Sequence, residues 1–91
     1  MRIDEKNYVI HKDKLVRAKT LLTSVYGVFE NEYDKESTEY LIHLIDLLLT
    51  DYKIDIREHV AEEFLVYYSV HNHEMIREAY LCLLKGIGGL I

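Results

Sequence analysis

The chain has 91 residues, of which 49% are hydrophobic and 30% charged, a composition typical of a folded globular protein rather than a disordered one. Its formal net charge of −5 is uneven, since residues 1–35 sum to +1 and residues 36–91 to −6, which argues against a large phosphate-binding surface. A single cysteine excludes an internal disulfide and a zinc knuckle.

The spacing of helix breakers and apolar runs bounds the organisation of the chain. There is no proline, and three of the four glycines follow Lys85, so little interrupts a helix before Gly86. No signal-peptide pattern occurs, and the longest apolar run, residues 40–49, is too short to span a bilayer. We therefore expect one cytoplasmic helical domain over residues 1–91, with a short arm at 1–11 and an apolar tail at 86–91.

Helical periodicity predicts a first helix over residues 12–33. Lysines and Arg17 flank its apolar stripe on both sides, and their aliphatic stems are expected to cover the edges of that stripe, although a nucleic-acid patch is the alternative. The predicted stripe consists of Leu15, Ala18, Leu22, Val25, Tyr26, Phe29 and Tyr33.

A second helix is predicted over residues 38–53, with Ser37 or Asp34 as its N-cap. Apolar residues cover more than half of its circumference, which favours burial against neighbours on two sides. Its apolar positions are Leu41, Ile42, Leu44, Ile45, Leu47, Leu48, Leu49 and Tyr52.

The pattern then predicts helices over 56–70 and 73–85. Asp55 and Glu58 approximate a capping box before the third helix, and Lys85-Gly86 predicts the end of the fourth, with Gly86 in the left-handed C′ position. The two apolar stripes are out of phase by roughly 110°, which favours a break over one continuous helix. The fold expected from these elements is an antiparallel four-helix bundle. The two stripes are Ile56, Val60, Phe64, Tyr67 and His71, and Met75, Ile76, Ala79, Tyr80 and Leu83.

The stretch His71-Asn72-His73-Glu74 has some features of a metal site. A metal needs three or four converging ligands, whereas the sequence supplies a two-histidine fragment without a Glu-x-x-His motif. Histidine near the end of one helix and glutamate in the first turn of the next are both favoured by the helix dipoles. We therefore interpret this stretch as a joint between two helices.

Other reactive residue types have structural explanations. Glu39, His43 and Asp46 share one face, but that face is the polar strip of a very apolar helix. Cys82 has no histidine three or four positions away and is expected to be an inert thiol. The sequence thus predicts no catalytic residue, no cofactor and no metal, and the chain is not expected to be an enzyme.

Two features bear on partners. Residues 56–84 loosely match a helix-turn-helix, but the expected recognition helix offers Arg77 among glutamates and the turn lacks its usual glycine. Leu81 and Leu84, by contrast, lie on the polar side of the fourth helix, next to an uncharged tail. We predict a patch that contacts a protein partner, with an acidic face steering its approach. The alternative is that the tail folds back and caps the end of the bundle. The patch is Leu81, Leu84, Leu90 and Ile91, and the acidic face is Glu58, Glu62 and Glu63.

In length and helix count the chain looks like bacteriocin immunity proteins and small phage-encoded inhibitors, a similarity that rests on no motif. Because the sequence offers no nucleophile with a base, no cofactor loop and no complete ligand set, we expect a small acidic protein that occupies a partner's surface as an inhibitor, immunity or regulatory adaptor protein, encoded by a phage or mobile element. A homodimer is a further expectation. The alternatives are a DNA-binding regulator that uses residues 56–84 and a small metal-binding or catalytic bundle.

Overall fold

The computed structural model describes residues 11–51 and 56–88. These residues form four helices and no strand: α1 (Lys12–Tyr26), α2 (Glu32–Asp51), α3 (Arg57–Val70) and α4 (Glu74–Gly86). The predicted all-α fold with four helices is confirmed. None of these helices is long and apolar enough to cross a membrane.

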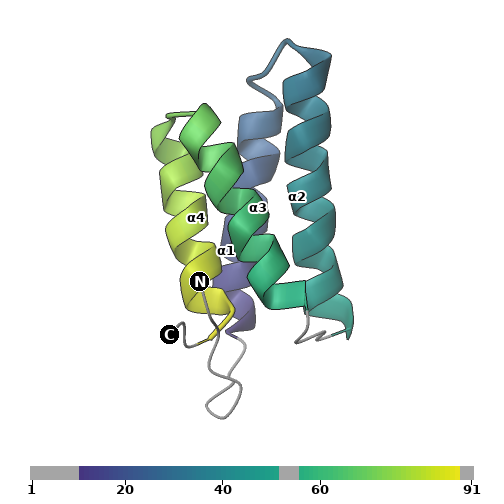
Figure 1. The fold of residues 1–91 in the computed structure, drawn as a ribbon, viewed down its shortest axis with the longest axis vertical. Coiled ribbons are helices and arrows are strands. Elements are labelled where there is room, and N and C mark those ends of the chain that lie inside the picture. Colours follow the sequence, from purple (N-terminus) through teal and green to yellow (C-terminus); the bar gives the residue numbers. More distant parts are fainter. Residues whose placement is uncertain (1–10, 52–55, 89–91) are drawn as a thin grey trace.

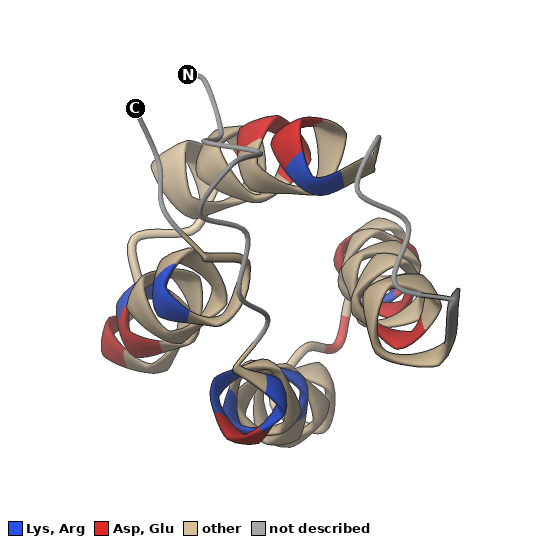
Figure 2. Cartoon of the chain, turned by 90° about the horizontal axis from the view of Figure 1, so that it is seen from below, with Lys and Arg blue, Asp and Glu red and all other residues tan. Residues whose placement is uncertain are grey.

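The helices form a compact bundle in which the chain rises through α1, descends through α2, rises through α3 and descends through α4 (Figure 1). Seen end on, they occupy the corners of a square, and α1 lies between α2 and α4 (Figure 2). Contacts between chain-distant residues agree with this arrangement. The His11 N–H donates to the Gly86 carbonyl at 3.0 Å, at the start of α1 and the end of α4.

The core forms from apolar residues three or four positions apart on each helix, as the four stripes predict. It extends beyond the predicted stripes to Leu21, Ala61 and Ile87. The buried apolar residues are Leu15, Ala18, Leu21, Leu22, Val25, Leu41, Leu44, Ile45, Leu48, Val60, Ala61, Phe64, Tyr67, Ile76, Ala79, Tyr80, Leu83 and Ile87.

The boundary between the first two helices differs from the prediction. The expected first helix over 12–33 is wrong, because α1 ends at Tyr26 and a turn begins at Gly27, where the Val28 N–H donates to the Val25 carbonyl at 2.9 Å. The expected start of the second helix at 38 is wrong as well. Asn31 precedes α2, and its side-chain oxygen accepts the Tyr33 N–H at 2.8 Å, a bond typical of an N-cap. Neither Ser37 nor Asp34 is the cap.

The joint between α3 and α4 lies at residues 71–73, as predicted. His71 follows the last turn of α3, where its N–H donates to the Tyr67 carbonyl at 2.9 Å. His73 precedes α4, and its Nδ1 accepts the Met75 N–H at 3.1 Å. The two histidines of the joint therefore bond to different helices, His71 to the end of α3 and His73 to the start of α4.

The end of α4 corrects the assignment of Gly86. Gly86 is still helical, and among the glycines that the structure describes the one with positive φ is Gly88, at 89°. Gly86 instead lies against the start of α1, where a Cβ would be 2.7 Å from Leu15 Cδ2 and 3.1 Å from Leu15 N. Glycine is required there because α1 and α4 approach closely.

The helical periodicity did not predict the burial of two polar residues. Thr38 is fully buried on α2, and Arg57 is fully buried at the start of α3, where its Nη1 donates to the Ile87 carbonyl at 2.9 Å.

Several predictions lie outside the described residues: most of the arm 1–11, the polypeptide around Tyr52 and Asp55, and Leu90 and Ile91 of the tail.

Candidate functional site

The apolar patch predicted on α4 is smaller in the structure than in the sequence. Leu81 is 46% exposed, whereas Leu84 is half-buried and packs against the core. Leu90 and Ile91 lie outside the described residues. Of this patch, Leu81 is the residue that the structure places on the surface.

The predicted acidic face lies on α3. Glu58 and Glu62 are exposed, and Glu63 is half-buried in a groove between α3 and α2. The helix that carries Leu81 is on the other side of α3 from α2 (Figure 2). The structure therefore does not bring Glu63 and Leu81 onto one surface.

The groove between α2 and α3 is the candidate site. Toward the end that holds the two turns, α3 inclines away from α2 (Figure 1), and the groove there has a volume of about 170 Å³. Its floor is made by Leu41 and Tyr67, which are both buried. The residues that line it are Tyr33, Ser37, Tyr40, Leu41, Glu63, Val66, Tyr67, Val70 and His71. We name it the α2–α3 groove.

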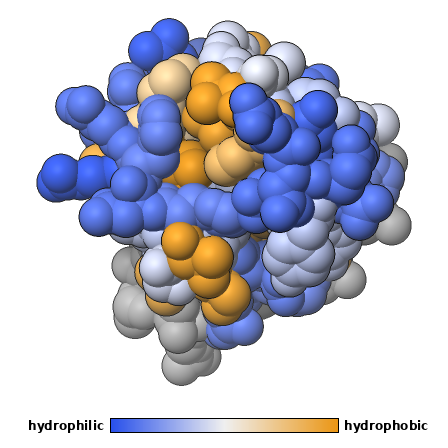
Figure 3. Space-filling model, turned by 90° about the horizontal axis from the view of Figure 1, so that it is seen from above, coloured by the Kyte–Doolittle hydropathy of each residue, from blue (hydrophilic) through white to orange (hydrophobic). Residues whose placement is uncertain are grey.

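Large apolar side chains around this groove are exposed. Tyr33 is 73% exposed, Tyr40 47%, Val66 61% and Val70 70%. A single exposed apolar residue is ordinary, but four around one groove form a patch of the kind that marks interaction sites. Seen from the end that holds the turns, apolar side chains emerge between polar ones (Figure 3).

The local sequence explains why these side chains meet. Tyr33 and Tyr40 are seven residues apart on α2 and share a face, and Val66 and Val70 are four apart on α3. Helical periodicity did not predict this site, because it places Tyr33 on the first helix and leaves Val66 and Val70 outside the apolar stripes. The run Phe64-Leu65-Val66-Tyr67-Tyr68 was the available signal, since a helix apolar on all sides needs more than one contact surface.

A set of polar contacts fixes the upper end of the groove. Thr38 donates to the Asp34 carbonyl at 2.8 Å, and its oxygen lies 2.6 Å from the Tyr67 hydroxyl. Because the single hydroxyl proton of Thr38 is used toward Asp34, the Tyr67 hydroxyl donates in this pair. Burial raises the pKa of Tyr67, and the negative charge of Asp34 raises it further. Tyr67 therefore stays neutral at ordinary pH and serves as a structural donor.

His71 closes the same end. Its ring centroid lies 5.2 Å from that of Phe29 and 4.7 Å from that of Tyr67. Its Nε2 is 3.6 Å from Asp34 Oδ1, which joins the end of α3 to the first turn of α2. Aromatic packing and this polar contact orient the imidazole within the groove wall.

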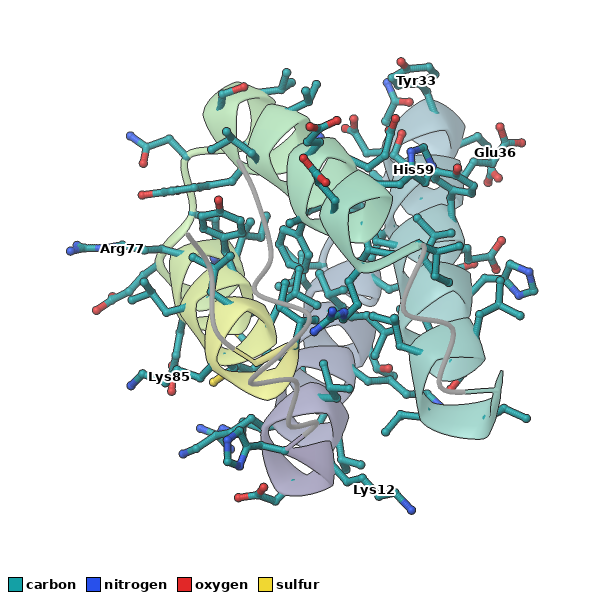
Figure 4. All side chains as sticks on the ribbon, turned by 60° about the horizontal axis from the view of Figure 1, so that its bottom comes forward. Lys12, Tyr33, Glu36, His59, Arg77 and Lys85 are labelled. Atoms are coloured by element: carbon teal, nitrogen blue, oxygen red, sulfur yellow. The ribbon has the colours of Figure 1, made fainter. Side chains whose placement is uncertain are left out.

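Farther along the groove, His59 Nε2 lies 3.3 Å from the Tyr40 hydroxyl and so connects α3 to α2. Figure 4 shows Tyr33 and Glu36 of α2 together with His59 of α3 on one side of the molecule. Arg77 and Lys85 of α4 are on the opposite side of that view. The groove thus belongs to a face with acidic and aromatic groups.

Charge divides between the two halves of the bundle (Figure 2). Residues 32–50 of α2 carry five acidic residues and one lysine, and α3 carries three acidic residues and one arginine, so this pair has a formal charge of −6. Helix α1 has four basic residues and one acidic residue, and α4 has two basic and two acidic residues. The pair α1 and α4 therefore has a formal charge of +3. The α2–α3 groove therefore lies on the acidic half.

The basic residues of α1 are partly engaged with neighbouring helices. Arg17 Nη2 lies 3.2 Å from Glu78 Oε1 of α4, and Lys19 Nζ lies 2.6 Å from Asp46 Oδ1 of α2. These ion pairs agree with the expectation that this cluster flanks the stripe of α1.

The candidates for metal and catalytic chemistry remain apart. Within residues 11–51 and 56–88, no group of three or more His, Cys, Asp or Glu side chains is placed to hold a metal ion. Asp46 pairs with Lys19, and Glu39 bonds the Tyr26 hydroxyl and, through its charge above all, raises the pKa of Tyr26. Two of the three residues on this shared face, Glu39 and Asp46, thus contact α1, and His43 between them is exposed.

Comparison with protein-family models, with curated proteins and with solved structures finds no match to this chain.

Proposed function

We propose that this chain acts by binding another protein through the α2–α3 groove, as an inhibitor, immunity or regulatory adaptor protein. The observation that carries the proposal is the gathering of four exposed apolar side chains around one groove of about 170 Å³. Covering these side chains removes apolar area from water, which is the main driving force of protein association.

The acidic half of the bundle favours a protein over a nucleic acid as the partner. A formal charge of −6 on residues 32–50 of α2 together with α3 repels phosphate and steers basic surfaces toward the groove. The helix-turn-helix alternative would use α3 and α4, but Arg57 of α3 is fully buried, which leaves Arg77 and Lys85 as the exposed cations of this pair.

The charge also bears on self-association. Two copies that met through their α2–α3 faces would bring together two sets of residues, 32–50 and α3 of each copy, that each have a formal charge of −6. Like charges across an interface disfavour the contact. The proposed partner is therefore a different protein.

Affinity capture from the native cell tests the proposal. The bait is the full chain, and its variants are Val66→Ser and Val70→Ser in the groove, Leu81→Ser in the patch predicted from the sequence, and Val16→Ser on α1 as a control. Val16 is 50% exposed, so the control makes the same chemical change on a surface outside the groove. Truncating a central contact residue costs about tenfold or more in affinity.

We expect the groove variants to lose a protein that wild type, Leu81→Ser and Val16→Ser all recover. Loss with Leu81→Ser and not with the groove variants would assign the contact to α4 instead. Equal recovery with every variant would show that the groove is not the contact surface.

A further inference from the structure

We infer that the occupant of the α2–α3 groove is an amphipathic helix that inserts one large apolar side chain and carries Lys or Arg beside it. This inference rests on the proposed function and adds the chemical class of the partner segment. Length, volume, backbone and charge each support it.

The wall of the groove sets the length of the occupant. On α2 the lining residues run from Tyr33 to Leu41, and on α3 from Glu63 to His71. At about 1.5 Å of rise per residue, each wall is ~12 Å long. A helix lying along it would make contact over about two turns.

The volume of the groove limits how many side chains of the partner can insert into it. A cavity of about 150 Å³ with apolar walls takes up one benzene molecule. The α2–α3 groove, at about 170 Å³, therefore has room for one leucine or phenylalanine side chain between Tyr40 and Val66. The exposed parts of Tyr33 and Val70 remain for contacts with neighbouring residues of the same segment.

The backbone of the groove favours a helical occupant over a β-strand. A segment that binds as a β-strand gains affinity by adding to a sheet edge, and the described part of the chain contains no strand. An amphipathic helix, by contrast, satisfies its own backbone hydrogen bonds and needs only an apolar groove. The α2–α3 groove offers side chains for contact and no edge of a β-sheet.

Charge complementarity decides what flanks the anchor. Glu63 lines the groove, Glu62 precedes Val66 by one helical turn, and Glu36 lies between Tyr33 and Tyr40 along α2. Glu36 and Glu62 are exposed. No Lys or Arg is among the described residues that line the groove. Basic side chains beside the anchor would thus meet carboxylates on both walls, whereas acidic ones would be repelled.

Three synthetic helical peptides of about four turns test the inference against the full chain. The first has a leucine stripe flanked by lysines, the second has the same leucines flanked by glutamates, and the third keeps the lysines but has alanine in place of leucine. Titration calorimetry gives the affinities, and amide chemical shifts of the labelled chain locate the contact.

We expect the first peptide to bind and to shift amides of residues 33–41 and 63–71. The second should bind ~tenfold or more weakly, because each of three surface ion pairs contributes a factor of a few. The third should not bind measurably. Glu63→Gln should weaken the first peptide, while Glu74→Gln, an exposed control on α4, should leave its affinity unchanged.

Equal affinity for the lysine and glutamate peptides would overturn the inference, and so would shifts confined to α1 and α4 or the absence of any binding. In each case the proposed function would still stand if capture depends on Val66 and Val70. Sedimentation of the chain alone measures whether it associates with a second copy of itself. Self-association that Val66→Ser abolishes would identify the occupant as a second copy and would contradict the inference.

Discussion

The Tyr67 hydroxyl donates to Thr38 Oγ1 at 2.6 Å, and this bond joins the two walls of the groove beneath its exposed side chains. Both residues are buried, so neither hydroxyl can exchange this bond for one to bulk water. We predict that Tyr67→Phe lowers the free energy of unfolding by about 1–2 kcal/mol. Urea denaturation measures it, with Tyr33→Phe as a control that should change little, because the Tyr33 side chain is exposed.

The same tyrosine makes stability depend on alkaline pH. Burial raises the pKa of Tyr67 above its ordinary value of 10.0, so the unfolded chain releases this proton at a lower pH than the folded chain does. The stabilisation is fully present below pH 10.0 and is lost as the pH rises from there through the folded pKa. Burial raises the pKa of Tyr80 too, and the charge of Glu39 raises that of Tyr26.

We therefore predict a melting temperature that falls above about pH 10, with a smaller fall in Tyr67→Phe than in wild type. Thermal melts across this pH range measure the difference. An identical alkaline slope in both proteins would contradict the assignment of a raised pKa to Tyr67.

A glycine pair tests the close approach of α1 and α4. A Cβ on Gly86 would meet Leu15 at 2.7 Å, so Gly86→Ala should destabilise the protein by about 1–3 kcal/mol. Gly27 has helical φ and ψ, and its Cβ would meet Ser24 O at an ordinary 3.6 Å. Gly27→Ala should therefore be neutral or stabilise by about 0.4–1 kcal/mol. Denaturant melts that rank the two variants in the opposite order would refute this account of Gly86.

A further prediction concerns His73 in the joint between α3 and α4. His73 Nδ1 accepts the Met75 N–H, so His73→Ala should destabilise the start of α4 by about 1 kcal/mol. His73→Asn keeps an acceptor near the same position and should recover most of the loss. If the alanine and asparagine variants unfold at the same denaturant concentration, the side chain of His73 does not cap α4.

Much of the fold follows from the sequence because burial in a helical bundle repeats every three or four residues. The stripes of α3 and α4 and the joint at residues 71–73 are examples. The first boundary did not follow. Val28 and Phe29 continue the apolar pattern of α1 through the turn at Gly27, so periodicity alone places Tyr33 on the wrong helix.

The candidate site was harder to predict, for a different physical reason. The burial of Thr38 and Arg57 depends on partners from other helices, Tyr67 and Ile87, and the pattern along one helix does not contain that information. The groove depends on how α3 is inclined relative to α2. Glu63 was the one predicted contact residue that the structure places in it.

Hydrogen exchange of the chain in complex with its captured partner tests the central claim most directly. We expect binding to slow exchange of backbone amides in residues 33–41 and 63–71, the two walls of the groove, and to leave exchange in α1 and α4 unchanged. Slowed exchange around Leu81 of α4, with the groove walls unchanged, would contradict it.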